Sequence, residues 1–310
     1  MKFTNIKIQF MKKILLSAAL LCSGVLGYAQ LLNVQSIEKV TLPEGVTINS
    51  ATISPNGEFF VIAQNGQSGI HRFDIASKSI STISLTGIPH DVKISNDGST
   101  ILFREPRVNE NRLRQIALKA FDVKRGAETT IAPFSRDLQG SAIINNNVVA
   151  VNSNKLTAKN LNGGEAKVTM PVASIRFGQL CIDGKVISPN GTTGNSYLWP
   201  SVSPDGTRVL YFLASSGCYI ANIDGSNPVY LGSIHAPRWY DNNLVIGMYD
   251  RDNGHKIYAS RLVAISADGK VKQDLTDDQS LSLFPTVTAD GDKISYITPA
   301  GELFIINITR

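Results

Sequence analysis

A short turn motif recurs along most of this chain, and it constrains the fold more than any other sequence feature. Its clearest copy, residues 202–206, reads Val-Ser-Pro-Asp-Gly and precedes the apolar run 209–212. Serine suits the first position of a type I turn, proline presets φ at the second, and glycine suits the fourth. The motif therefore predicts a tight turn between two β-strands. Further copies lie at residues 53–57, 94–98 and 287–291, with weaker ones at 144–147 and 239–243.

A second marker, an apolar strand end followed by a turn, recurs in step with the first. In residues 221–225 it reads Ala-Asn-Ile-Asp-Gly. The two markers divide the chain into six units of four strands, at intervals of roughly 40–60 residues, and this combination is typical of a β-propeller. We therefore expect an all-β fold, a six-bladed β-propeller of four-stranded antiparallel blades. The other copies of this marker lie at residues 73–75, 121–123, 159–161, 263–265 and 306–308.

The two ends of the repeat predict how the ring closes. Residues 36–42 match the fourth-strand segment 79–85, yet no first, second or third strand precedes them. The last unit, conversely, ends at its third strand, residues 303–308. The N-terminal strand should therefore complete the last blade, which removes two exposed strand edges at once.

A long connection, residues 162–201, leaves the number of blades open. It is about twice as long as the corresponding connections of the other units, and long insertions are often functional. One interpretation is a ligand platform that carries Tyr197 and Trp199. The alternative is a degenerate extra blade, built around the hairpin-like residues 181–185, which would make seven blades.

Residues 200–211 and 285–291 resemble the WD-repeat-like units of TolB-type six-bladed propellers. The resemblance covers essentially the whole chain after residue 29 and implies the propeller fold of an exported bacterial protein. The chain departs from TolB itself because it has no room for the separate N-terminal α/β domain. The resemblance therefore does not imply TolB's role in an envelope complex.

The first 29 residues have the pattern of a secretory signal peptide. Lys12 and Lys13 precede an apolar run from residue 14 to 26, and Gly27 and Ala29 flank Tyr28 before an expected cleavage site at Gln30. No later segment is apolar and long enough to cross a membrane. We expect residues 30–310 to form a monomeric propeller that is periplasmic or secreted.

The net charge of +5 comes mostly from this leader. Beyond residue 29 the chain has 26 basic residues against 25 acidic ones, because the leader holds four lysines and no acid. A nearly neutral chain lacks the basic field that nucleic-acid binding requires. The composition therefore predicts no nucleic-acid partner.

Two cysteines, Cys181 and Cys218, remain beyond the leader. In an exported protein they could form a disulfide, which would close a loop of about 38 residues and stabilise by roughly 3–4 kcal/mol. The alternative is two separate buried thiols that pack as small hydrophobic groups. Two cysteines are too few for a zinc cluster.

The connections between second and third strands, and between successive blades, share one end of every blade, which we call the loop end. Residues 104–114 lie there and include Arg107, Arg112 and Arg114. They could bind an acidic partner or a glycan, or they could form a solvated loop with internal ion pairs. Tyr197, Trp199 and Arg238 are further candidate ligand-binding residues, because aromatic side chains beside arginine can stack on sugars or peptides.

The four histidines are all expected at the loop end. His90 and His235 precede the first strand of their units by the same spacing, and His71 begins a third strand. His255 follows Asp250 and Asp252 in another loop. His90, His235, His255, Asp250 and Asp252 could therefore hold Ca²⁺ or a transition metal, although the spacing fits neither an HExxH motif nor an EF-hand. The alternative is that they are ordinary polar residues of the rim, with no cofactor.

Catalytic motifs are missing from the sequence, which contains no G-x-S-x-G nucleophile elbow and no phosphate-binding glycine loop. We therefore expect a non-catalytic exported scaffold that binds an envelope protein or a glycan at its loop end. The alternative is a metal-dependent polysaccharide lyase of the propeller type, in which histidines hold the metal.

Overall fold

The computed structural model describes residues 30–86, 89–168, 170–194, 196–214, 216–279 and 281–309. Contacts separate the chain into residues 1–30 and a second compact unit, residues 31–310, which contains every strand that the structure describes. The predicted signal peptide, residues 1–29, lies outside the described residues. The account below concerns the second unit.

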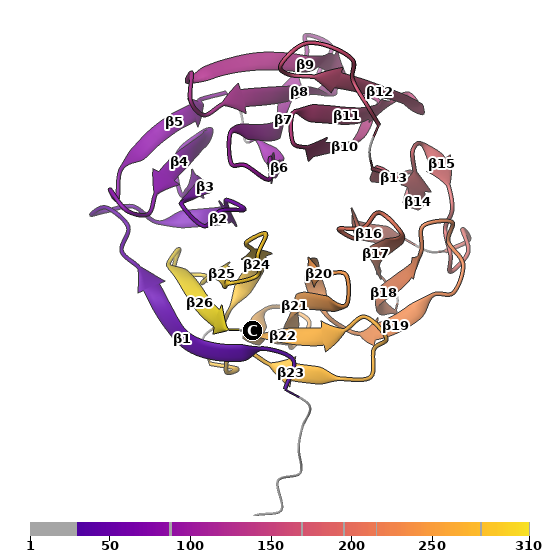
Figure 1. The fold of residues 1–310 in the computed structure, drawn as a ribbon. Coiled ribbons are helices and arrows are strands. Elements are labelled where there is room, and N and C mark those ends of the chain that lie inside the picture. The colour runs from indigo at the N-terminus through magenta and orange to yellow at the C-terminus, as the bar shows by residue number, and fades with distance from the viewer. Residues whose placement is uncertain are drawn as a thin grey trace, which may run out of the picture. The chain divides into compact units, whose positions relative to one another are not determined.

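Seven antiparallel sheets follow one another along the chain and form the blades of a β-propeller (Figure 1). The first strands of most neighbouring blades contact one another, and all of them surround the axis of the ring. In chain order, blade 1 is β2 (Ile48–Ile53), β3 (Phe59–Gln64), β4 (Ile70–Asp74) and β5 (Ile80–Ser84); blade 2 is β6 (His90–Ile94), β7 (Thr100–Val108), β8 (Arg114–Asp122) and β9 (Ala127–Ser135); blade 3 is β10 (Leu138–Ile144), β11 (Asn147–Asn152) and β12 (Lys155–Asn160).

The remaining blades include the one that completes the ring. Blade 4 is β13 (Ala173–Arg176), β14 (Gln179–Ile182) and β15 (Lys185–Val186); blade 5 is β16 (Tyr197–Val202), β17 (Arg208–Leu213), β18 (Gly217–Asn222) and β19 (Val229–Gly232); blade 6 is β20 (His235–Asp241), β21 (Leu244–Asp252), β22 (Ile257–Ser266) and β23 (Lys272–Asp274); blade 7 is β24 (Leu283–Val287), β25 (Lys293–Ile297), β26 (Leu303–Thr309) and β1 (Asn33–Val40).

The all-β propeller of antiparallel blades is confirmed, but the expected number of six blades was wrong. The additional blade is blade 4, which arises from the long connection 162–201, so the alternative of a degenerate seventh blade is the correct one. Blade 4 has only three strands, of four, four and two residues. These short strands explain why the repeat motif is not recognisable in this blade. Blades 3 and 4 both lack a fourth strand.

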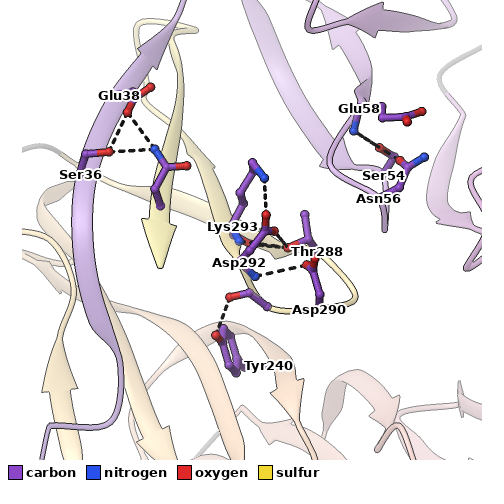
Figure 2. A network of polar contacts seen from close by, with 12 residues as sticks. Ser36, Glu38, Ser54, Asn56, Glu58, Tyr240, Thr288, Asp290, Asp292 and Lys293 are labelled. Atoms are coloured by element: carbon purple, nitrogen blue, oxygen red, sulfur yellow. Dashed lines mark hydrogen bonds and ion pairs between the residues drawn. The ribbon is translucent and has the colours of Figure 1, made fainter. Parts of the chain in front are cut away.

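Closure of the ring by the N-terminal strand is confirmed. β1 pairs antiparallel with β26, from Val40 opposite Leu303 to Asn33 opposite Thr309. Polar side chains reinforce this seam: the Asn307 amide nitrogen donates to Ser36 Oγ at 2.8 Å and to Glu38 Oε1 at 2.9 Å (Figure 2). The strand that begins the described chain therefore covers the edge of the strand that ends it.

The repeated turn motif works through a buried hydroxyl group. Ser203 Oγ accepts a hydrogen bond from the backbone N–H of Arg208, five residues later, at 3.0 Å. Thr288 makes the same bond to the Lys293 N–H at 3.0 Å (Figure 2). These hydroxyls satisfy a donor at the start of the second strand, which explains why serine or threonine recurs at this position. The equivalent residues in blades 1 and 2 are Ser54 and Ser95.

The same turn predicts a response to acid. Asp205 accepts hydrogen bonds from Ser203 Oγ at 2.6 Å and from the Thr207 N–H at 3.0 Å, and these bonds, the Ser203 one first, lower its pKa to about 2. Since this pKa lies below the unfolded value, Asp205 stabilises the fold at neutral pH, and that contribution is lost as pH falls from about 4 to about 2.

We therefore expect an Asp205→Asn variant to be less stable at pH 7 and to lose less stability than the unsubstituted protein between pH 4 and pH 2. Urea unfolding at several pH values measures this. Glu44→Gln, at an exposed site, serves as the control and should keep the original pH dependence. Parallel curves for Asp205→Asn and the unsubstituted protein would contradict the assignment.

Tyrosines cross blade 5 from its first strand to its fourth. Tyr211 is fully buried, its ring stacks on Tyr219 at a centroid distance of 5.7 Å, and its hydroxyl donates to Asn190 Oδ1 at 2.6 Å. Tyr197 and Tyr230 continue the row on either side. Cross-strand aromatic contacts of this kind stabilise a sheet beyond the area that they bury.

Candidate functional site

The first strands of four blades carry a β-bulge near the loop end, and a non-glycine residue in each bulge has a positive φ. These residues are Asp91, Trp199, Ala236 and Phe284, with φ between 44° and 54°. The pairing register shifts at each of them. Left-handed backbone costs an L-residue roughly 1–2 kcal/mol, and such strain gathers at functional sites. The bulges leave Asp91, Trp199 and Phe284 partly exposed, whereas Ala236 is buried.

Charged side chains gather beside the first of these bulges. Asp91 forms an ion pair with Lys93, and the Arg104 Nε atom lies 3.6 Å from its other carboxylate oxygen. The Arg104 side chain is 13% exposed and donates to the Leu138 carbonyl oxygen at 3.0 Å. Burial opposes ionisation of Asp91, but Lys93 and Arg104 outweigh it and lower its pKa. Asp91 therefore carries its negative charge at neutral pH.

Arg238 adds a third cation to this group. It lies on β20 of blade 6, and its guanidinium is exposed to solvent but closely surrounded by protein. The surrounding protein lowers the pKa of Arg238, and the nearby charge of Asp91 opposes that effect. Blades 2 and 6 are not neighbours in the ring, so the charge of Asp91 acts on Arg238 across the axis that the first strands surround. We call Asp91, Lys93, Arg104 and Arg238 the axial cluster.

Next to the axial cluster, His235 and Asp250 form a hydrogen-bonded pair. His235 Nδ1 lies 2.7 Å from Asp250 Oδ2, and the Asp250 side chain is only 2% exposed. The Ser260 hydroxyl lies 2.6 Å from the other carboxylate oxygen of Asp250. A carboxylate at Nδ1 favours the tautomer that donates from this atom, which leaves Nε2 as an acceptor. Nε2 has no hydrogen-bond partner within the described residues.

Aromatic rings border the His235 imidazole. Phe212 and Trp199 lie 5.0 Å and 5.9 Å from it, measured between ring centroids. Trp199 is 39% exposed, and Phe284, at the equivalent bulge of blade 7, is 47% exposed. β16 and β24, which carry them, contact β20 on its two sides. Two exposed aromatic side chains therefore flank the strand that holds His235 and Arg238.

The arginine-rich segment 104–114 is mostly strand rather than loop. β7 continues to Val108 and β8 begins at Arg114, so the connection is shorter than expected. Arg107, Arg112 and Arg114 are all exposed, and Arg107 packs over the Phe134 ring at 3.8 Å and donates to Gln115. Arg114 is close enough to lower the pKa of Arg104, although burial is the larger cause. The segment thus adds positive charge beside the axial cluster.

The candidate metal ligands come together only in part. His235 and Asp250 are paired, but His255 lies in an exposed loop, where Asp252 accepts from the Gly254 N–H. His90 begins β6, where its charge helps to lower the pKa of Asp91. His71 is buried in β4. Among the described residues no three His, Cys, Asp or Glu side chains are grouped to hold a metal ion.

Three other candidates lie in the core. Tyr197 is fully buried, and its hydroxyl accepts from the Asn190 N–H and donates to the Gly191 carbonyl, so it is not accessible to a ligand. Cys181 and Cys218 are free, buried thiols on β14 and β18, and burial raises the pKa of both. In the structure they pack as small hydrophobic groups.

Sequence reasoning missed three residues of the axial cluster, namely Asp91, Lys93 and Arg104. Asp91 and Lys93 lie one and three residues after His90, in a first strand that should line the axis. Two charged residues in an innermost strand were the signal that could have identified them.

Among the described residues, no helix is long and apolar enough to span a bilayer.

Comparison with known proteins adds support for the fold. No family model and no curated protein sequence matches the chain. A chain in the crystal structure of the mitotic checkpoint complex is 11% identical, with a TM-score of 0.59 over 90% of this chain and 96% of that one. An oligogalacturonate lyase in complex with manganese is 15% identical (TM-score 0.47, 86% of this chain and 79% of that chain).

A second oligogalacturonate lyase, from Vibrio parahaemolyticus, is 14% identical, with a TM-score of 0.45 over 85% of this chain and 78% of that one. At an identity this low, the likeness to the chain of the mitotic checkpoint complex shows the fold alone. The TolB-type resemblance therefore remains a prediction from the repeat. On its own strand order and on the first of these likenesses, the chain is a seven-bladed β-propeller.

Proposed function

We propose that this protein is a non-catalytic binding module that holds a protein or polymer ligand at the loop end of its propeller. The observation that supports the proposal most is the axial cluster, in which Lys93 and Arg104 flank the Asp91 carboxylate and the charge of that carboxylate also acts on Arg238. The exposed aromatic side chains Trp199 and Phe284 lie on strands next to β20, which carries Arg238. Ligand sites commonly combine a few oriented polar groups with aromatic surface. The leader-like residues 1–29 suggest that the ligand is met in the periplasm or outside the cell.

Capture from envelope extract tests this proposal. Purified residues 30–310 are immobilised as the unsubstituted chain, as Arg238→Gln and as Arg107→Gln/Arg112→Gln/Arg114→Gln. We expect the bound material to be reduced at least fivefold by Arg238→Gln and by a smaller factor by the triple variant, because Arg238 belongs to the axial cluster whereas Arg114 only adds charge beside it. Material retained equally by all three proteins would contradict a site at the axis.

A metal-dependent polysaccharide lyase is the second candidate function, and the His235–Asp250 pair is the observation that favours it. Histidines that bind metals usually donate their other ring nitrogen to a carboxylate, as His235 does here. Metal analysis of the purified chain separates the two candidates. One transition-metal or Ca²⁺ ion per chain, lost in a His235→Ala variant, would favour the lyase, whereas metal well below one per chain favours the binding module.

A further inference from the structure

We infer that the axial cluster binds the carboxylate of a sugar acid, with Trp199 or Phe284 packing against the face of the sugar ring. The inference rests on the proposed binding function and names its class of ligand. It is argued from the charge balance of the cluster, from its open hydrogen-bond donors and from the aromatic side chains that flank it.

The charge balance favours an anion. Lys93, Arg104 and Arg238 contribute three positive charges, and Asp91 contributes the single negative charge of the cluster itself. The neighbouring Asp250 carboxylate is buried and is hydrogen-bonded to His235 and Ser260. Arg114 brings further positive charge close to Arg104. Closely surrounded charges are screened less than those on an open surface. An anion from solution would therefore relieve the repulsion between these cations.

The donors available to a ligand belong mainly to Arg238, which is exposed. The Arg104 Nε atom has no hydrogen-bond partner within the described residues, but it is buried, and 3.6 Å separates it from Asp91. Arg238 makes one hydrogen bond, from Nη1 to the Pro237 carbonyl oxygen at 3.3 Å. Guanidinium groups bind carboxylates through two parallel N–H donors. The arrangement therefore suits a planar carboxylate better than a spherical anion.

The aromatic side chains indicate that the ligand also has an apolar face beside its carboxylate. Trp199 and Phe284 occupy equivalent bulges in blades 5 and 7, on either side of the strand that carries Arg238. A sugar acid presents a carboxylate and an apolar ring face a few ångströms apart on one rigid frame. A peptide would have to order several bonds to present both groups together, at an entropic cost. Nucleic acid is disfavoured because the chain beyond residue 29 is almost neutral.

Binding measurements with purified residues 30–310 test the inference. The probes are an oligoglucuronate, the neutral oligoglucose of the same length and an oligoglutamate peptide, all titrated calorimetrically at low salt. We expect the oligoglucuronate to bind at least about tenfold more tightly than either other probe, because only it offers a carboxylate and a rigid ring together. Equal or tighter binding of oligoglucose or oligoglutamate would overturn the inference.

Variants locate the site. Arg238→Gln should weaken oligoglucuronate binding about tenfold or more. Arg112→Gln is the matched control, an exposed arginine at a turn of blade 2 outside the cluster, and should bind normally. Asp91→Asn removes the competing carboxylate and keeps a residue that tolerates positive φ, so it should bind severalfold more tightly. A loss of affinity in Asp91→Asn, or none in Arg238→Gln, would overturn the inference.

The two proposals fail in different ways. If no oligoglucuronate binds while capture from extract still depends on Arg238, the sugar-acid inference fails and the binding module stands. If capture does not depend on Arg238 either, the axial site itself is wrong.

Discussion

Ending the chain after Glu302 is expected to prevent the whole ring from folding, rather than to remove one strand. β26 lies between β25 and β1, so its loss leaves β1 without a partner and exposes one edge of β25. Leu303, Ile306 and Ile308 are also buried, and burial of each such side chain contributes about 1.5–3 kcal/mol. The sum is comparable with the total stability of a typical domain, about 5–15 kcal/mol. Circular dichroism and limited proteolysis of the truncated protein measure the loss.

Point variants in β26 and β1 measure how much single side chains at this seam contribute to stability. Ile306→Ala should lower the free energy of unfolding by about 2–5 kcal/mol, because the side chain is fully buried in the cluster between blades 6 and 7. Ile37 is paired opposite it in β1 but is 44% exposed, so Ile37→Ala should cost less than about 1 kcal/mol. A truncated protein that keeps a cooperative thermal transition would contradict closure by β1.

Tyr211→Ala is the substitution expected to destabilise blade 5 most. The ring is fully buried and lies between the Tyr197 and Tyr219 rings, and truncation of a buried aromatic side chain costs about 3–5 kcal/mol. Tyr211→Phe keeps the ring and removes only the hydrogen bond to Asn190, so it should cost about 1 kcal/mol. Urea unfolding followed by circular dichroism measures both.

Tyr230→Ala provides the matched control for this prediction. Tyr230 belongs to the same row of rings but is 50% exposed, so its removal should change stability by less than about 1 kcal/mol. Similar losses in Tyr211→Ala and Tyr230→Ala would show that position in the row, and not burial, determines the contribution.

The turns could be predicted from sequence because they depend on local chemistry, and the closure of the ring because each end of the repeat lacks the strands that the other end supplies. The buried hydroxyl of Ser203, the Asp205 carboxylate and the glycine that follows act within six residues. Blade 4 was not predicted as a regular unit because its first turn, Phe177-Gly178, lacks the serine and aspartate of the repeated turn motif. Its strands are also at most four residues long. Its stability comes from neighbouring blades, which a local motif cannot reveal.

The candidate site was only partly predictable, for a different reason. The pair His235 and Asp250 was named from its place in the repeat, and the structure brings these two together. The axial cluster depends on Asp91 and Arg238, which come from blades on opposite sides of the ring. The direction in which Asp91 points depends on a bulge, and bulges follow from the pairing register of two strands rather than from the residues of one.

The pairing of β1 with β26 has a consequence for the order of events during synthesis. The hydrogen bond between Asn33 and Thr309 spans 276 positions, so β1 leaves the ribosome long before its partner strand exists. Contacts this distant in sequence form slowly, and an unpaired edge is meanwhile open to other chains. A chaperone that shields this segment until the last blade is made would therefore be expected to raise the yield of native protein.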